Sequence, residues 1–131
     1  MKRVAMWLAI LVVGAWTNAM SASEIGDTDA GAKVFSKCKA CHQVGAGAVN
    51  KVGPNLNGVF GRRAGSVAGY KYSKSMLRAG SDELDWTYDT LNAFIENPKS
   101  LISKSRMSFK GLNDDKDRAD LLAYLRLFSD N

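Results

Sequence analysis

The chain has 131 residues, of which 46% are hydrophobic and 24% are charged, and its formal charge at pH 7 is +5. These values suit one small globular domain. The positive charge is spread along the chain without dense blocks of Lys and Arg, which argues against a nucleic-acid-binding protein.

The first 23 residues have the organisation of a secretory signal peptide. Lys2 and Arg3 precede an almost wholly apolar run over residues 4–16, and small or polar residues follow. We expect cleavage at about residues 19–23, which leaves a mature domain of residues 24–131 in the periplasm and lowers the formal charge from +5 to +3 by removing Lys2 and Arg3. The apolar run is shorter than the about 20 residues of a transmembrane helix, and an uncleaved membrane anchor is the alternative.

The mature part begins with a predicted helix and continues into an unusual loop. Asp27 can cap a helix over residues 28–40, in which Val34, Phe35 and Cys38 recur at helical spacing. Seven of the 12 glycines then fall between residues 45 and 69, together with Pro54. So long a loop in a small domain is reasonable if it wraps something that is not protein.

Three more helices are expected further along the chain. One spans residues 73–79 and ends at Gly80, and another spans about 87–97 and ends before Pro98. The last follows Asn113, begins with three aspartates and continues to about residue 128 with an apolar stripe, made of Leu121, Leu122, Leu125 and Phe128. No segment alternates as a strand. The sequence predicts an all-α fold of four to five short helices with long glycine-rich loops. Such a fold is poorly supplied with core residues, and an apolar group in the middle would make up for the shortage.

The segment Cys38-Lys39-Ala40-Cys41-His42 contains both cysteines and the only histidine. One interpretation is a disulfide or a Cys-x-x-Cys redox pair. A zinc site would need carboxylates to complete its ligands, because no further Cys or His exists. The third interpretation is a covalent c-type haem, whose attachment motif is Cys-x-x-Cys-His.

Two features favour one covalent haem c. The motif follows the first mature helix and leads into the glycine-rich loop, whereas a thioredoxin-like pair follows a strand. A large apolar cofactor would also supply the missing core. In this interpretation Cys38 and Cys41 each bond a vinyl group, and His42 binds the iron.

The iron needs a sixth ligand, and bis-histidine ligation is excluded because the chain has one histidine. Lysine, water and methionine remain as candidates. Met76 and Met107 are the internal methionines of the mature part, and either could be a packing residue. Met76 lies in a predicted helix, whereas Met107 lies in an irregular polar stretch between two helices, where ligands are common. We therefore favour Met107.

With these features, the chain resembles the class I cytochromes c of mitochondria and the bacterial periplasm. The likeness extends over almost all of the mature chain, in the order GAKVFSKCKACHQV, KVGPNLNGVFGRRAGS, YKYS, a tryptophan at 86, FIENPK, SRMSF and DLLAYL. It implies haem attachment at Cys38 and Cys41 and iron ligation by His42 and Met107. It also implies that the carbonyl of Pro54 binds the second ring nitrogen of His42.

The same resemblance implies roles outside the ligand set. Arg62, Tyr72 and Trp86 would hold the haem propionates. Gly31 and Phe35 in the first helix would cross Leu121 and Tyr124 in the last. Where the family usually has Pro-Gly-Thr-Lys before the ligand methionine, this chain has Ser103-Lys104-Ser105-Arg106, so we expect a more mobile ligand loop. Phe94 occupies a position where relatives often have a tyrosine.

With both axial positions filled, the iron exchanges electrons but binds no substrate, which predicts a one-electron carrier and no enzyme. We expect a monomer that binds no nucleic acid and docks on membrane-bound or periplasmic redox proteins, such as a quinol-oxidising cytochrome bc complex, a terminal oxidase, a reaction centre or a dehydrogenase. The docking edge would be basic and include Lys37, Lys39, Lys51, Lys99, Arg106 and Lys110. The alternatives are a haem enzyme or gas-binding cytochrome with an open sixth site and, in third place, a thiol–disulfide oxidoreductase.

Overall fold

The structure is a computed structural model and describes residues 26–129; the predicted signal peptide, residues 1–23, lies outside the described residues. Within that range the chain forms five helices: α1 (Thr28–Phe35), α2 (Lys74–Ser81), α3 (Tyr88–Glu96), α4 (Pro98–Leu101) and α5 (Asp115–Arg126). Extended pairing among the described residues is limited to one isolated antiparallel bridge between Arg63 and Asp85. The predicted all-α class is confirmed.

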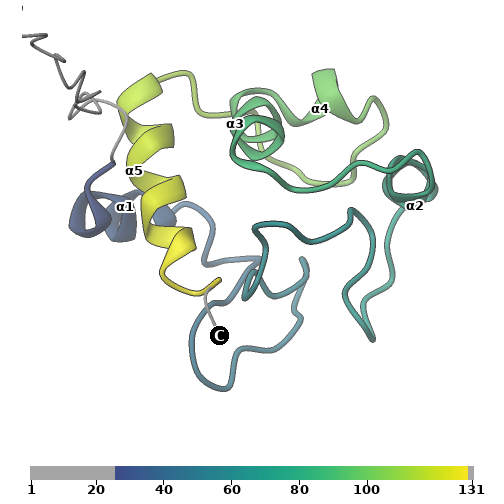
Figure 1. Cartoon of the computed structure of the whole chain (residues 1–131), viewed down its shortest axis with the longest axis horizontal. Coiled ribbons are helices and arrows are strands. Elements are labelled where there is room, and N and C mark those ends of the chain that lie inside the picture. The colour runs from purple at the N-terminus through teal and green to yellow at the C-terminus, as the bar shows by residue number, and fades with distance from the viewer. Residues whose placement is uncertain (1–25, 130–131) are drawn as a thin grey trace, which may run out of the picture.

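The first and last helices pack against each other, as Figure 1 shows on the left of the molecule. Gly31 makes this contact possible, because a Cβ at this position would lie 2.0 Å from the carbonyl oxygen of Asp120. The rings of Phe35 and Tyr124 stack beside it with centroids 5.4 Å apart. The predicted crossing of the two helices is therefore confirmed.

Two buried charged residues of α5 extend this packing. The Asp120 carboxylate accepts hydrogen bonds from the backbone N–H of Asp27, at 2.8 Å, and from Lys116, at 2.6 Å. Arg118, whose side chain is 5% exposed, donates to Asn92 in α3 and to the carbonyl oxygen of Leu112. These bonds tie α5 to the start of α1, to α3 and to the segment before α5.

Several predicted helix boundaries are wrong. The first helix ends at Phe35 and not at residue 40, because the N–H groups of Ser36, Lys37 and Cys38 bond the carbonyl oxygens three residues back and the chain tightens there into turns. Helix α2 continues through Gly80 and ends in a turn with left-handed Glu83 (φ 65°). The short helix α4 was not predicted, and Asp114 caps α5 in place of Asn113.

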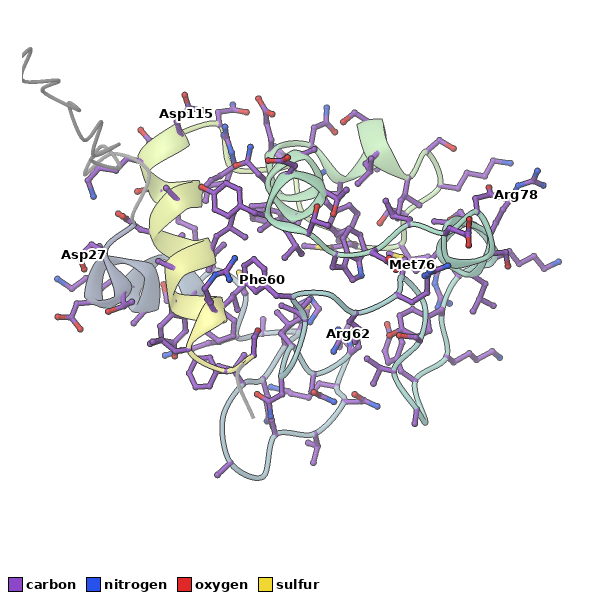
Figure 2. All side chains as sticks on the ribbon, in the orientation of Figure 1. Asp27, Phe60, Arg62, Met76, Arg78 and Asp115 are labelled. Atoms are coloured by element: carbon purple, nitrogen blue, oxygen red, sulfur yellow. The ribbon has the colours of Figure 1, made fainter. Side chains whose placement is uncertain are left out.

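A long irregular segment joins α1 to α2 and fills the lower part of the molecule in Figure 1. Figure 2 shows Phe60 from this segment beside α5, where the guanidinium of Arg126 lies 4.4 Å from the centre of the Phe60 ring. The buried apolar residues come from the helices and from this segment alike; they are Val34, Phe35, Val59, Ala64, Trp86, Leu91, Phe94, Ile95, Ile102, Leu112, Leu121, Leu122 and Leu125. None of the described helices has the length and apolar character to span a membrane.

Candidate functional site

The Cys-x-x-Cys-His segment forms a compact turn directly after α1. The backbone N–H groups of Cys41 and His42 both donate to the carbonyl oxygen of Cys38, at 3.1 and 2.9 Å. Both thiols are free and half-buried, and Cys38 packs against the apolar core. The turn therefore presents two thiols and one imidazole within five residues, anchored to a helix that is itself fixed against α5.

The environment of Cys38 does not favour thiol–disulfide exchange. Burial raises the pKa of this thiol to about 11, although the charge of Lys37 acts in the opposite direction. A redox-active Cys-x-x-Cys pair needs a thiol with a lowered pKa, because the thiolate is the reacting form. Cys38 is thus poorly suited to be the reactive thiol of such a pair.

His42 is held from two sides. Its Nδ1 lies 2.7 Å from the carbonyl oxygen of Pro54, which fixes Nδ1 as the donor and leaves Nε2 with a lone pair. The ring also lies against the main chain of Gly53, since a Cβ on residue 53 would be 2.3 Å from Cε1. Burial lowers the pKa of His42, the hydrogen bond to Pro54 acts in the opposite direction, and the charge of Arg62 lowers the pKa again, so the net shift is downward. The imidazole is therefore neutral near pH 7, which is the form that binds a metal.

The loop around His42 is ordered by hydrogen bonds from asparagine side chains. Asn57 accepts from the N–H of Gly45 and donates to its carbonyl oxygen, at 2.8 and 2.9 Å. Asn50 accepts from the backbone and side chain of Asn55. The N–H of Gly53 donates to the carbonyl oxygen of Cys41, so the two sides of the loop meet at the histidine.

The structure brings Arg62, Tyr72 and Trp86 into one partly buried region. The backbones of Arg62 and Trp86 are paired, and the N–H of Trp86 donates to the carbonyl oxygen of Arg62 at 2.9 Å. The pKa of Tyr72 is raised by burial, whereas its hydrogen bond from the N–H of Val67 and the charge of Arg62 lower it. The rings of Trp86 and Phe94 lie 5.0 Å apart, so Trp86 is also a core residue.

Arg62 itself is incompletely paired. Its Nη1 donates to the carbonyl oxygens of Asn55 and Asn57, at 3.2 and 3.1 Å. Within residues 26–129, its Nε is the buried side-chain polar atom that has no hydrogen-bond partner. An unpaired buried donor on a cation is costly, and an acidic group of a bound cofactor would satisfy it.

The two candidate methionines occupy different settings. Met76 lies in the first turn of α2, and Figure 2 shows it pointing toward the middle of the molecule while Arg78 points away. Met107 lies in the irregular stretch between α4 and α5. Both are half-buried and pack against the apolar core. Both thioethers therefore lie near the interior of the molecule.

Basic side chains line two surface cavities, one beside His42 and one beside Met107. The first has a volume of about 350 Å³ and includes Lys39 and Lys51. The second has a volume of about 210 Å³ and includes Lys99, Lys110 and the ring of Phe109. All six cations predicted at the docking edge are exposed. Arg106 is engaged within the chain, because its guanidinium donates to the carbonyl oxygen of Lys71.

The residues present fit a covalent haem. Two thiols three residues apart, a neutral imidazole with a free nitrogen and a buried guanidinium with an unpaired donor are what a haem with acidic propionates requires. Sequence reasoning missed the contact of Gly53 with the histidine ring and the bonds made by Ser75 and Arg106 near Met107. For the contact of Gly53 with the histidine ring, the one signal in the sequence was the adjacent pair Gly53-Pro54.

Comparison with known proteins agrees with this chemistry. The family model "Cytochrome c" matches residues 28–128. A cytochrome c2 of Afifella marina is 46% identical over 99 residues, covering 76% of this chain and 80% of the relative. A cytochrome c-554 of Methylosinus trichosporium is 41% identical over 128 residues, covering 98% and 95%. The structure of cytochrome c2 from Rhodospirillum centenum superposes with a TM-score of 0.76 at 38% identity and covers 79% of this chain and 99% of the other. The chain belongs to the cytochrome c family: it carries one covalent haem c on Cys38 and Cys41, and it transfers electrons and is not an enzyme.

Proposed function

We propose that the protein is an exported one-electron carrier in which His42 and Met107 are the axial ligands of the haem iron. The observation that carries this proposal is the 2.7 Å contact between His42 Nδ1 and the carbonyl oxygen of Pro54. This contact fixes the tautomer that offers Nε2 to a metal, directly after the two attachment cysteines. When bound, the haem supplies an iron that alternates between the ferric and ferrous states.

Met107 is the proposed ligand on the other side of the iron. It lies in a segment without helical hydrogen bonds, so its backbone can adopt the position that ligation needs. Met76, in contrast, is fixed by α2, where its N–H bonds the capping hydroxyl of Ser73. A thioether together with a histidine raises the reduction potential of a c-type haem. Together, His42 and Met107 would leave no open position on the iron for small molecules.

Arg62, Tyr72 and Trp86 would hold the acidic propionates. The unpaired Nε of Arg62 can donate to a carboxylate. Burial raises the pKa of Tyr72, so its phenol remains protonated and can donate as well. Trp86, which is 6% exposed, keeps water away from this region. Together these residues compensate two negative charges that would otherwise be costly to bury.

The protein exchanges electrons with redox partners, and we propose that these partners present acidic surfaces. Exposed Lys39 and Lys51 flank His42, and exposed Lys99 and Lys110 flank Met107. Long-range attraction of this kind speeds encounter and is weakened by salt. A membrane-bound quinol-oxidising complex, oxidase, reaction centre or dehydrogenase in the periplasm is the expected kind of partner. The signal-like residues 1–23, which lie outside the described residues, would direct the export.

Carbon monoxide binding tests the closed coordination sphere. If His42 and Met107 both ligate the iron, the reduced holoprotein at neutral pH should leave its visible spectrum unchanged under carbon monoxide, and a potentiometric titration should follow a one-electron curve. Rapid, stoichiometric carbon monoxide binding would mean an open sixth position and would favour a gas-binding cytochrome or a haem enzyme.

A further inference from the structure

The segment that carries Met107 is tied to the segment before α2 at two points. A guanidinium nitrogen of Arg106 (Nη2) donates to the carbonyl oxygen of Lys71 at 2.5 Å. The hydroxyl of Ser75 donates to the carbonyl oxygen of Lys104 at 3.0 Å. The bonded residues are 35 and 29 positions apart, so both bonds join separate parts of the fold.

These two bonds lie where the loop has few other anchors. Upstream, Ile102 is buried and its N–H bonds the carbonyl oxygen of Pro98 in α4. Downstream, Leu112 is buried and its N–H donates to the carbonyl oxygen of Ile95. The carbonyl oxygen of Leu112 accepts a hydrogen bond from the guanidinium of Arg118. Met107 lies midway, five residues from each anchor. Within the loop, the N–H of Ser105 donates to the carbonyl oxygen of Ile102 at 2.9 Å, the Ser105 hydroxyl accepts a longer hydrogen bond, of 3.3 Å, from the N–H of Met107, and the side chains of Met107 and Phe109 pack against the core.

We propose that Arg106 and Ser75 are positioning residues for Met107 and form a latch that holds the thioether in place. This inference rests on the proposed ligation by Met107. Packing of the Met107 side chain against the core leaves the backbone before it to be held by hydrogen bonds, and ordering each residue costs about 1–2 kcal/mol. The Arg106 bond restrains the residue directly before Met107, and the Ser75 bond restrains the chain two residues further upstream.

The latch also accounts for the departure from the family pattern. The usual Pro-Gly turn before the ligand methionine is replaced here by Ser103-Lys104, which removes a stiff turn. The bonds to the carbonyl oxygen of Lys104 and from the guanidinium of Arg106 restore a restraint on the same four residues. The expected mobile loop is thereby held by contacts with another segment and not by its own backbone.

Displacement of the thioether by added imidazole in the ferric holoprotein measures how firmly Met107 is held. The variants are Arg106→Ala, Ser75→Ala and the conservative Arg106→Lys. We expect imidazole to bind about tenfold more tightly to Arg106→Ala, which corresponds to about 1.4 kcal/mol, and about threefold more tightly to Ser75→Ala. Arg106→Lys should return most of the way to wild type, because an ammonium can also donate to the carbonyl oxygen of Lys71.

Matched controls separate the latch from general weakening of the fold. Arg78→Ala removes an exposed arginine of α2 whose carboxylate partner, Asp82, is only four residues away, so no distant segment is tied by this ion pair. Ser81→Ala removes a hydroxyl that bonds within its own helix, to Leu77. Both controls should bind imidazole as wild type does.

The outcomes are distinguishable from failure of the proposed function. The ferric iron–sulfur charge-transfer band in wild type establishes the thioether ligand, and its absence would overturn both the ligation and the latch. If the band is present and Arg106→Ala and Ser75→Ala both keep wild-type imidazole affinity, the latch alone is refuted. Should Arg106→Ala fail to accumulate, Ser75→Ala and Arg106→Lys decide the question.

Discussion

The main chain of Gly53 lies against the imidazole of His42, and a Cβ added to residue 53 would be 2.3 Å from Cε1 and 2.8 Å from Nδ1. The ring nitrogen Nδ1 is also hydrogen-bonded to the carbonyl oxygen of the next residue, Pro54. Glycine and the hydrogen bond therefore act together: one gives the ring room and the other fixes its orientation.

A methyl group at residue 53 should displace the proposed iron ligand. We expect Gly53→Ala to destabilise the holoprotein by about 1–3 kcal/mol through overpacking and to shift its reduction potential, because the ring must move away from Pro54. Gly47→Ala is the control, since nothing lies within 4 Å of its Cβ and only its φ of 73° opposes the change. Guanidinium unfolding and potentiometry on both variants check this, and an unchanged potential in Gly53→Ala would contradict it.

Glu83 ends α2 in the left-handed conformation, with a φ of 65°. The N–H groups of Leu84 and Glu83 bond the carbonyl oxygens of Ala79 and Gly80, which is the Schellman pattern in which glycine is preferred. Glycine adopts the left-handed conformation without strain, although it also has more conformational entropy to lose on folding. The relief of strain is the larger contribution, so Glu83→Gly should stabilise the fold by about 0.5–1 kcal/mol. Thermal unfolding against Glu83→Ala measures it; equal stability of the two variants would show that backbone strain is not relieved.

Asp120 should make stability depend on pH in the acid range. The hydrogen bonds from Lys116, first, and from the N–H of Asp27 lower the pKa of this carboxyl. Because the folded-state pKa lies below the unfolded value of about 3.9, the stabilisation is present above that value and is lost as the pH falls through the folded pKa. Asp120→Asn should lower stability near pH 7 and flatten the loss below about pH 4. Asp29→Asn in α1 is the exposed control, and parallel acid titrations of wild type and Asp120→Asn would be evidence against this assignment.

Lys99 and Lys110 should govern reactions with anionic partners. In Lys99→Glu/Lys110→Glu, oxidation by hexacyanoferrate(III), an anion, should slow about tenfold at about 0.01 M salt and much less at about 0.1 M, where the Debye length falls from about 30 to 10 Å. Oxidation by a cationic cobalt(III) complex should become faster. Lys33→Glu/Arg78→Glu changes the net charge equally through exposed cations of α1 and α2, and the same slowing in this control would argue against a local basic edge.

Much of the fold could be predicted because helical spacing and caps are local. Ser73 and Thr87 do cap the helices that were expected after them. The end of α1 was predicted too late, because an apolar residue recurring every three or four positions fits both a helix and the turns that follow Phe35. Helix α4 has four residues and therefore no periodicity. Gly80 was mistaken for a stop, whereas it lies inside α2 where a Cβ would be 2.1 Å from the carbonyl oxygen of Ala64.

In the site, too, local features could be predicted from the sequence and contacts between distant segments could not. The Cys38–His42 spacing is local chemistry and predicted the haem. The contact between His42 and Pro54 was expected through the family resemblance, but the position of Gly53 under the ring depends on how a loop folds back. The bonds of Arg106 and Ser75 join residues about 30 positions apart. No local pattern in the sequence marks which side chain will reach which distant carbonyl oxygen.

The most direct test of the central claim is the ferric absorption spectrum of the purified holoprotein and of its two methionine variants. With His42 and Met107 as axial ligands, wild type and Met76→Ala show the iron–sulfur charge-transfer band, whereas Met107→Ala lacks it and has a lower reduction potential. Persistence of the band in Met107→Ala together with its loss in Met76→Ala would transfer the ligand to α2 and contradict the account.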